Sequence, residues 1–71
     1  MYERIKELRV DKDIKQREIA TLLNTTQQQY SKIEKGTSEI TADKLVKLCL
    51  FYNVSADYIL GLPQNLPYPE R

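Results

Sequence analysis

The residues that break helices are confined to a few points of this sequence, and this limits what the chain can fold into more than any other feature. All three prolines, Pro63, Pro67 and Pro69, lie in the last nine residues, and the two glycines are Gly36 and Gly61. Between these points, apolar residues recur at intervals of three and four, which is the period of an α-helix with one buried face. The sequence therefore predicts an all-α domain over residues 1–62, followed by a proline-punctuated tail over residues 63–71.

Signals at the ends of the apolar segments divide this domain into five helices. Thr26, Thr41 and Ser55 each have a hydroxyl that can cap a helix N-terminus. Gly36 and Gly61 can adopt the left-handed conformation that ends a helix. The expected helices are roughly residues 2–12, roughly residues 16–23, the segment between Thr26 and Gly36, the segment that follows Thr41, and roughly residues 56–60.

The composition argues against most catalytic and metal-binding chemistry. The 71 residues include no histidine and a single cysteine, Cys49, so the sequence offers no internal disulfide, no zinc site and no Cys–His or Ser–His nucleophile pair. We therefore expect no enzyme activity, no metal or cofactor and no small-molecule ligand, and we interpret Cys49 as a core residue. The N-terminus is charged from Glu3 onward, and the longest apolar run, LCLFY, is too short to cross a bilayer. Both features favour a cytoplasmic protein without a membrane partner.

The segment between Thr26 and Gly36 has two distinct faces. At about 100° per residue, Tyr30 and Ile33 fall on the inward face. Gln29 lies near the buried side, where it has the right spacing from Thr26 to form a capping box. The opposite face is polar and carries Gln27, Gln28, Ser31, Lys32 and Lys35.

This polar face has the hydrogen-bonding groups of a helix that reads DNA. A glutamine amide can form two hydrogen bonds with adenine at N6 and N7, and a lysine can donate to guanine O6 and N7. The net charge of only +1 argues weakly against a nucleic-acid partner, because DNA-binding domains usually have a marked basic surplus. Glutamine and lysine are also good helix formers, so periodicity alone supports a merely solvated face equally well.

The stretch QREIATLLNTTQQQYSKIEKG, residues 16–36, resembles the helix-turn-helix of the phage repressor and Cro family of transcription regulators. The similarity extends to RIKELR before it and to LVKLCLFYNVSADYILG after it, and it covers about residues 3–62. It implies a lambda-repressor-like five-helix bundle whose third helix enters the major groove of double-stranded DNA. The family's base-reading positions fall on Gln27, Gln28 and Lys32.

The same resemblance implies the contacts around the third helix. Gln16 matches a position that contacts phosphate and braces this helix, and Arg9 is expected to pair with Glu34. The sequence departs from the family pattern at Lys15, where a Ser or Thr cap is usual, at Asn24, which is often Gly, and in its lack of a basic surplus. The expected phosphate-contacting residues are Gln16, Thr26, Ser31, Lys35, Thr37 and Ser38.

We interpret the sequence as a bacterial or phage-encoded regulator that binds a DNA operator, with repression as the expected mode. One short helix reads only a few base pairs, so we expect a homodimer on a two-fold site. Tyr58, Leu62 and Leu66 either form the dimer contact or simply cover the core. Two alternatives stay open, namely a protein-interaction module of the same fold that does not bind DNA, and the antitoxin partner of a toxin.

Overall fold

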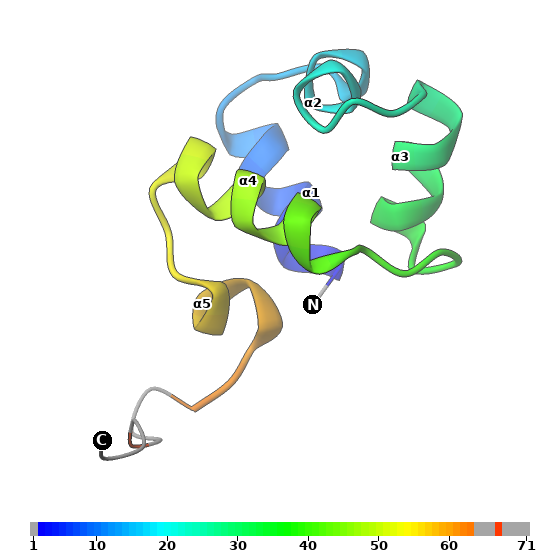
Figure 1. Cartoon of the computed structure of the whole chain (residues 1–71). Coiled ribbons are helices and arrows are strands. Elements are labelled where there is room, and N and C mark those ends of the chain that lie inside the picture. Colours follow the sequence, from blue (N-terminus) through cyan, green and yellow to red (C-terminus); the bar gives the residue numbers. More distant parts are fainter. Residues whose placement is uncertain (1, 64–66, 68–71) are drawn as a thin grey trace.

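The computed structural model describes residues 2–63 and 67, and in this part of the chain it contains five α-helices and no strand. The helices are α1 (Tyr2–Asp11), α2 (Gln16–Leu22), α3 (Gln27–Lys35), α4 (Ala42–Tyr52) and α5 (Ala56–Leu60) (Figure 1). The predicted all-α architecture is confirmed, and the first two helices end one residue earlier than expected. Of the tail predicted over residues 63–71, only Pro63 and Pro67 lie within the described residues.

Every one of these helices is followed by a residue in the left-handed conformation. Gly36 and Gly61 end α3 and α5 with φ angles of 78° and 74°. Asp13, Asn24 and Asn53 follow α1, α2 and α4 with φ angles of 55°, 56° and 57°. Asn and Asp tolerate this conformation better than other residues that have a side chain. Short polar residues and glycines therefore stop each helix and allow the chain to turn into the next one.

The predicted N-caps are confirmed at three helices. Thr26, Thr41 and Ser55 each accept a hydrogen bond, at 3.1, 3.4 and 3.1 Å, from the backbone N–H three residues further along the chain. Lys15 occupies the N-cap position of α2 and makes no side-chain cap bond there. Such a bond stabilises a helix by typically about 1 kcal/mol, so α2 depends on its packing more than α3, α4 and α5 do.

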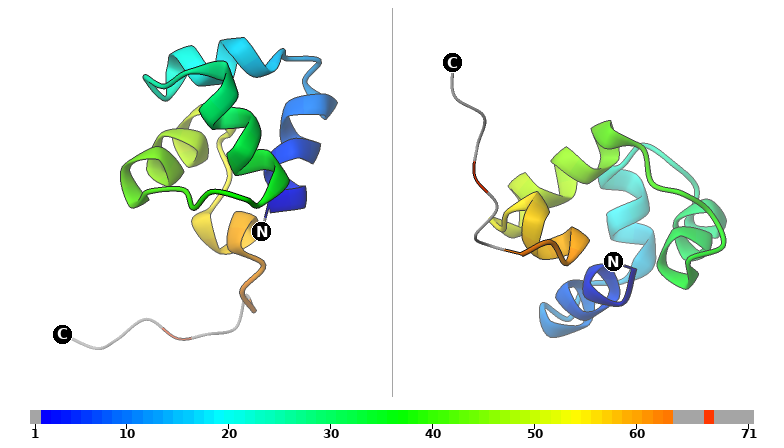
Figure 2. Two further views of the ribbon diagram at one scale, coloured as in Figure 1. Left: turned by 90° about the vertical axis from the view of Figure 1, so that its right-hand side faces the viewer. Right: turned by 90° about the horizontal axis from the view of Figure 1, so that it is seen from below.

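All five helices contribute to one apolar core. Ala20 of α2 is small and buried in this core. The helices α2 and α3 lie side by side (Figure 2). Cys49 is partly buried and packs against the core, as predicted. Each fully buried Leu or Ile stabilises the fold by about 1.5–3 kcal/mol relative to exposure. The core residues are Ile5, Ile19, Ala20, Leu23, Tyr30, Ile33, Leu48, Tyr52 and Ile59.

Arg4 connects the first helix to the last. Its Nη1 atom donates to the backbone carbonyl of Tyr58 at 2.7 Å, and its guanidinium lies 5.0 Å from the centre of the Tyr58 ring. A guanidinium over an aromatic face adds about 0.5–1 kcal/mol at an exposed site. The contact helps α1 to hold α5, which lies at the opposite end of the bundle from α2 (Figure 1). Within the described residues, no helix has the length and apolar character needed to span a membrane.

Candidate nucleic-acid interface

The outward face of α3 gathers the polar side chains that the sequence singled out. Gln27, Gln28, Lys32 and Lys35 are exposed, and Ser31 is half-buried. Together with Gln16 at the start of α2, these side chains line one open hollow of about 430 Å³. We call these six residues the α3 face. The structure thus brings all three predicted base-reading residues and three of the predicted phosphate-contacting residues onto one surface.

The opposite side of α3 is fixed in the core. Tyr30 and Ile33 are 0% and 1% exposed, and Glu34 is buried beside them. The helix is capped at both ends, by the Thr26 hydroxyl and by the left-handed Gly36. Because α3 cannot rotate without exposing this apolar side, the α3 face is held in a fixed orientation.

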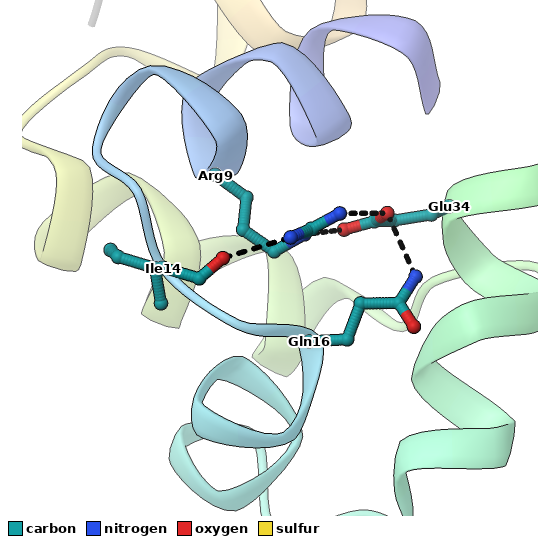
Figure 3. Close-up of polar contacts among 4 residues, drawn as sticks. All are labelled: Arg9, Ile14, Gln16 and Glu34. Atoms are coloured by element: carbon teal, nitrogen blue, oxygen red, sulfur yellow. Dashed lines mark hydrogen bonds and ion pairs between the residues drawn. The ribbon is translucent and has the colours of Figure 1, made fainter.

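A hydrogen-bonded network joins the C-terminal turn of α3 to α1 and α2 (Figure 3). Arg9 Nε donates to Glu34 Oε2 at 2.5 Å, and Arg9 Nη2 donates to Glu34 Oε1 at 3.1 Å. Arg9 Nη1 also donates to the Ile14 carbonyl at 2.8 Å, and Gln16 Nε2 donates to Glu34 Oε1 at 3.1 Å. The structure therefore brings the expected Arg9–Glu34 pair together and places Gln16 so that it braces α3 through the same carboxylate.

The network keeps the Glu34 carboxylate ionised although it is buried. Burial alone would raise its pKa, but hydrogen bonds from Arg9 and Gln16, the nearby Tyr30 hydroxyl and the charge of Arg9 outweigh burial and hold the pKa below its ordinary value. The Tyr30 hydroxyl lies close enough to contribute to this lowering, yet it has no partner of good hydrogen-bond geometry among the described residues. Burial also raises the pKa of Tyr52 to about 12, so that phenol stays neutral.

The capping box predicted at the start of α3 forms only in part. Thr26 accepts from the Gln29 backbone N–H, as predicted. The Gln29 side chain does not return to the helix N-terminus; its Nε2 atom donates to Ser38 Oγ at 2.8 Å. The prediction that Gln29 has a structural role is therefore right, but its predicted partner is wrong.

The remaining expected phosphate contacts lie at the two ends of α3. Thr26 is exposed at its N-terminus, and Thr37 and Ser38 follow its C-terminus. Thr37 is tied back to the helix, because both its backbone N–H and its Oγ1 donate to the Lys32 carbonyl, at 3.0 and 3.2 Å. These residues flank the α3 face along the direction of the helix.

The residues expected at a dimer contact are exposed as far as the structure describes them. Tyr58 and Leu62 are 41% and 44% exposed, and Leu66 lies outside the described residues. One face of the Tyr58 ring is already occupied by the Arg4 guanidinium. The structure also exposes apolar residues on α4 to which the sequence interpretation gave no role. These are Val46, Leu50 and Phe51, and their helical phase relative to the buried Leu48 and Tyr52 could have identified them.

Comparisons with known proteins find relatives over most of the chain. Residues 5–59 match the sequence model of the helix-turn-helix family. Over 58 residues the chain is 40% identical to the HTH-type transcriptional regulator ImmR of Bacillus subtilis (strain 168), and the match covers 82% of this chain and 46% of that protein. The chain thus spans about half the length of this curated relative. No solved structure matches the chain significantly.

Proposed function

The chain belongs to the helix-turn-helix family, and from this premise we propose that it binds double-stranded DNA and regulates transcription. The family match and the similarity to ImmR confirm the resemblance to phage repressor and Cro regulators. This is a family of regulators and not of enzymes. In our proposal α3 enters the major groove, and repression follows because a bound protein excludes others from the same DNA.

The α3 face is the observation that carries this proposal. The major groove is about 12 Å wide and admits an α-helix. Gln28 is exposed on the first turn of α3, on the opposite side from the buried Tyr30 and Ile33. Its amide can pair with adenine N6 and N7, while Gln27 and Lys32 can reach neighbouring base edges. Gln28 is therefore the residue that we propose as the main base reader.

The net charge of only +1 gives the protein little long-range attraction to DNA, so phosphate binding depends on where individual cations and neutral donors lie. Lys35 lies at the end of α3 and supplies one positive charge on the α3 face. Neutral donors such as Gln16 and Ser31 can hydrogen-bond to phosphate without releasing a counterion. We therefore expect affinity to fall with salt, but with a slope that corresponds to only a few phosphates neutralised.

Substitutions at Gln28 and Lys35 separate base reading from phosphate binding. Gln28→Ala is expected to weaken the best duplex by about 1–3 kcal/mol and to leave the salt slope unchanged. Lys35→Ala is expected to weaken all duplexes alike and to make the salt slope shallower by about 1. Fluorescence anisotropy across a salt series measures both quantities. If the wild-type protein binds no duplex at low salt, the proposal is wrong and the protein-interaction module, which the near-neutral charge favours, takes its place.

We further propose that the protein binds a two-fold operator as a homodimer through Tyr58 and Leu62. The half-sites would then lie about 34–36 Å apart, one helical turn of DNA. Leu62→Lys is expected to make the protein monomeric in sedimentation experiments at concentrations where the wild type is a dimer. Leu50→Lys is the control, since Leu50 is 77% exposed and lies on α4. Dissociation by Leu50→Lys alone would place the contact on α4 and contradict this part of the proposal.

A further inference from the structure

The two hydroxyl groups of the loop after α3 are in opposite hydrogen-bonding states. Thr37 Oγ1 donates its hydrogen to the Lys32 carbonyl at 3.2 Å. Ser38 Oγ instead accepts a hydrogen bond from Gln29 Nε2 at 2.8 Å. A hydroxyl has one hydrogen to donate, so Thr37 has used its hydrogen within the fold, whereas Ser38 still has its hydrogen to donate.

This difference decides which hydroxyl can bind an anion without losing a bond. A phosphate diester offers only acceptor oxygens, so a neutral hydroxyl binds it by donating. Thr37 would first have to break its bond to Lys32. Ser38 can donate to phosphate and accept from Gln29 at the same time, and a donor that accepts another hydrogen bond is polarised in the favourable direction.

We propose that Gln29 is a positioning residue for binding to the DNA backbone, in that its amide orients the Ser38 hydroxyl as a donor to a phosphate oxygen. This inference rests on the proposed function and names the role of the third glutamine in the QQQ sequence. Under this proposal Thr37 serves to shape the loop, and of the two hydroxyls only that of Ser38 contacts phosphate. Gln29 acts through Ser38 and reads no base.

Other hydrogen bonds hold the backbone on both sides of the Gln29–Ser38 bond. The Gln29 backbone is held by the Thr26 cap at 3.1 Å. The loop is anchored to the end of α3 by backbone bonds from Gly36 and Thr37, at 3.1 and 3.0 Å. Gln29 and Ser38 are both half-buried. A donor held in this way loses little further conformational freedom when it binds, so it adds to affinity more than a free serine would.

Four single variants and one double variant test the inference, with a random-sequence duplex of about 20 base pairs, or two helical turns. A phosphate contact does not depend on sequence, so the operator need not be known. Ser38→Ala is expected to weaken binding about tenfold, as the loss of a hydrogen bond to a charged group would. Gln29→Met keeps the side-chain length but loses the amide, and it is expected to weaken binding about threefold to tenfold. Thr37→Val is expected to lose less affinity than Ser38→Ala.

Gln29→Glu, the fourth variant, distinguishes an oriented donor from a merely structural contact. A carboxylate at this position only accepts, so it keeps the contact but draws the Ser38 hydrogen inward. We expect this variant to fold like the wild type and to bind DNA more weakly than Gln29→Met. Because the new charge also repels DNA, its effect is measured again in the Ser38→Ala background. In that background Gln29→Glu should cause a several-fold smaller loss of DNA affinity, since the Ser38 hydroxyl that it would turn inward is absent.

The outcomes separate this inference from the function on which it rests. If Gln29→Glu weakens DNA binding by the same factor in the wild type and in the Ser38→Ala background, charge repulsion explains its effect and the inference is overturned. If Gln29→Met and Ser38→Ala both bind DNA as tightly as the wild type does, the inference is overturned and the proposed function stands. If the wild type binds no duplex, both are overturned. Circular dichroism confirms that each variant is folded, and if Gln29→Met is not, Ser38→Ala and the Gln29→Glu comparison decide.

Discussion

Replacing Arg9 with alanine is expected to destabilise the fold more than replacing its partner Glu34. The side chain of Glu34 is only 3% exposed, whereas that of Arg9 is 13% exposed. Without Arg9, the carboxylate stays buried with the neutral Gln16 amide as a remaining donor. Breaking a buried ion pair in this way costs about 3–5 kcal/mol. Without Glu34, the guanidinium keeps its bond to the Ile14 carbonyl, so we expect a smaller loss of about 2–3 kcal/mol, in the range for hydrogen bonds to charged groups.

Urea denaturation at neutral pH, followed by circular dichroism, measures these losses. A domain of 71 residues has a total stability on the order of 4–10 kcal/mol, so Arg9→Ala brings the protein close to unfolding. Arg9→Lys is the milder variant, since it keeps the charge but cannot reproduce the two-pronged contact with the carboxylate. Lys6→Ala, an exposed position on the same helix, is the matched control and should change stability by no more than about 0.5 kcal/mol.

The double variant Arg9→Ala/Glu34→Ala tests whether the two residues act on each other. It should lose less stability than the sum of the single losses, because removing both partners leaves no unpaired buried charge. Single effects that add to within about 0.5 kcal/mol would show that the pair is not coupled. An Arg9→Ala variant as stable as Lys6→Ala would refute the whole argument.

Three further predictions concern pH and the ends of α3. The folded-state pKa of Glu34 is lowered, so its contribution to stability is present above its ordinary pKa of 4.5 and is lost as the pH falls through the folded value. The stability difference between the wild type and Glu34→Gln should therefore shrink in acid. Urea melts at several pH values measure this difference, and a constant difference would contradict the prediction. Gly36→Ala should cost more stability than Gly61→Ala, because both glycines have positive φ but a Cβ at Gly36 would lie 3.1 Å from the Tyr2 ring, whereas at Gly61 no atom lies within 4 Å. Thermal melts compare the two, and equal losses would show that the ring yields. Thr26→Ala should cost about 1 kcal/mol through the loss of the α3 cap, and an unchanged melt would mean that water replaces the hydroxyl.

The helices and their ends could be predicted from the sequence because their signals are local. Thr26, Thr41 and Ser55 cap helices by bonding to backbone only three residues away, so no knowledge of the tertiary fold was needed. The burial of Tyr30 and Ile33 followed from helical period alone, and it fixed the orientation of the α3 face.

Contacts between distant segments could not be predicted in the same way. The Gln29 amide could reach either the N-terminus of its own helix or the loop that follows α3. It bonds to Ser38 because of the path of that loop, which no local signal in the sequence specifies. The Arg9–Glu34 pair was expected only from the family resemblance, because no local signal links two residues that lie 25 positions apart. The sequence interpretation gave no role to Leu50, which is exposed on the side of α4 that faces away from the buried Leu48 and Tyr52.

The most direct test of the central claim, that the α3 face reads DNA bases through Gln28, is a selection of bound duplexes from a random pool. The selection is carried out in parallel with the wild type, Gln28→Ala and Gln29→Ala. We predict that the wild type enriches a near-palindromic sequence, that Gln28→Ala loses its preference at one base pair of each half-site, and that Gln29→Ala selects the wild-type sequence with lower affinity. A changed base preference for Gln29→Ala with an unchanged one for Gln28→Ala, or no enrichment by the wild type, would contradict the account.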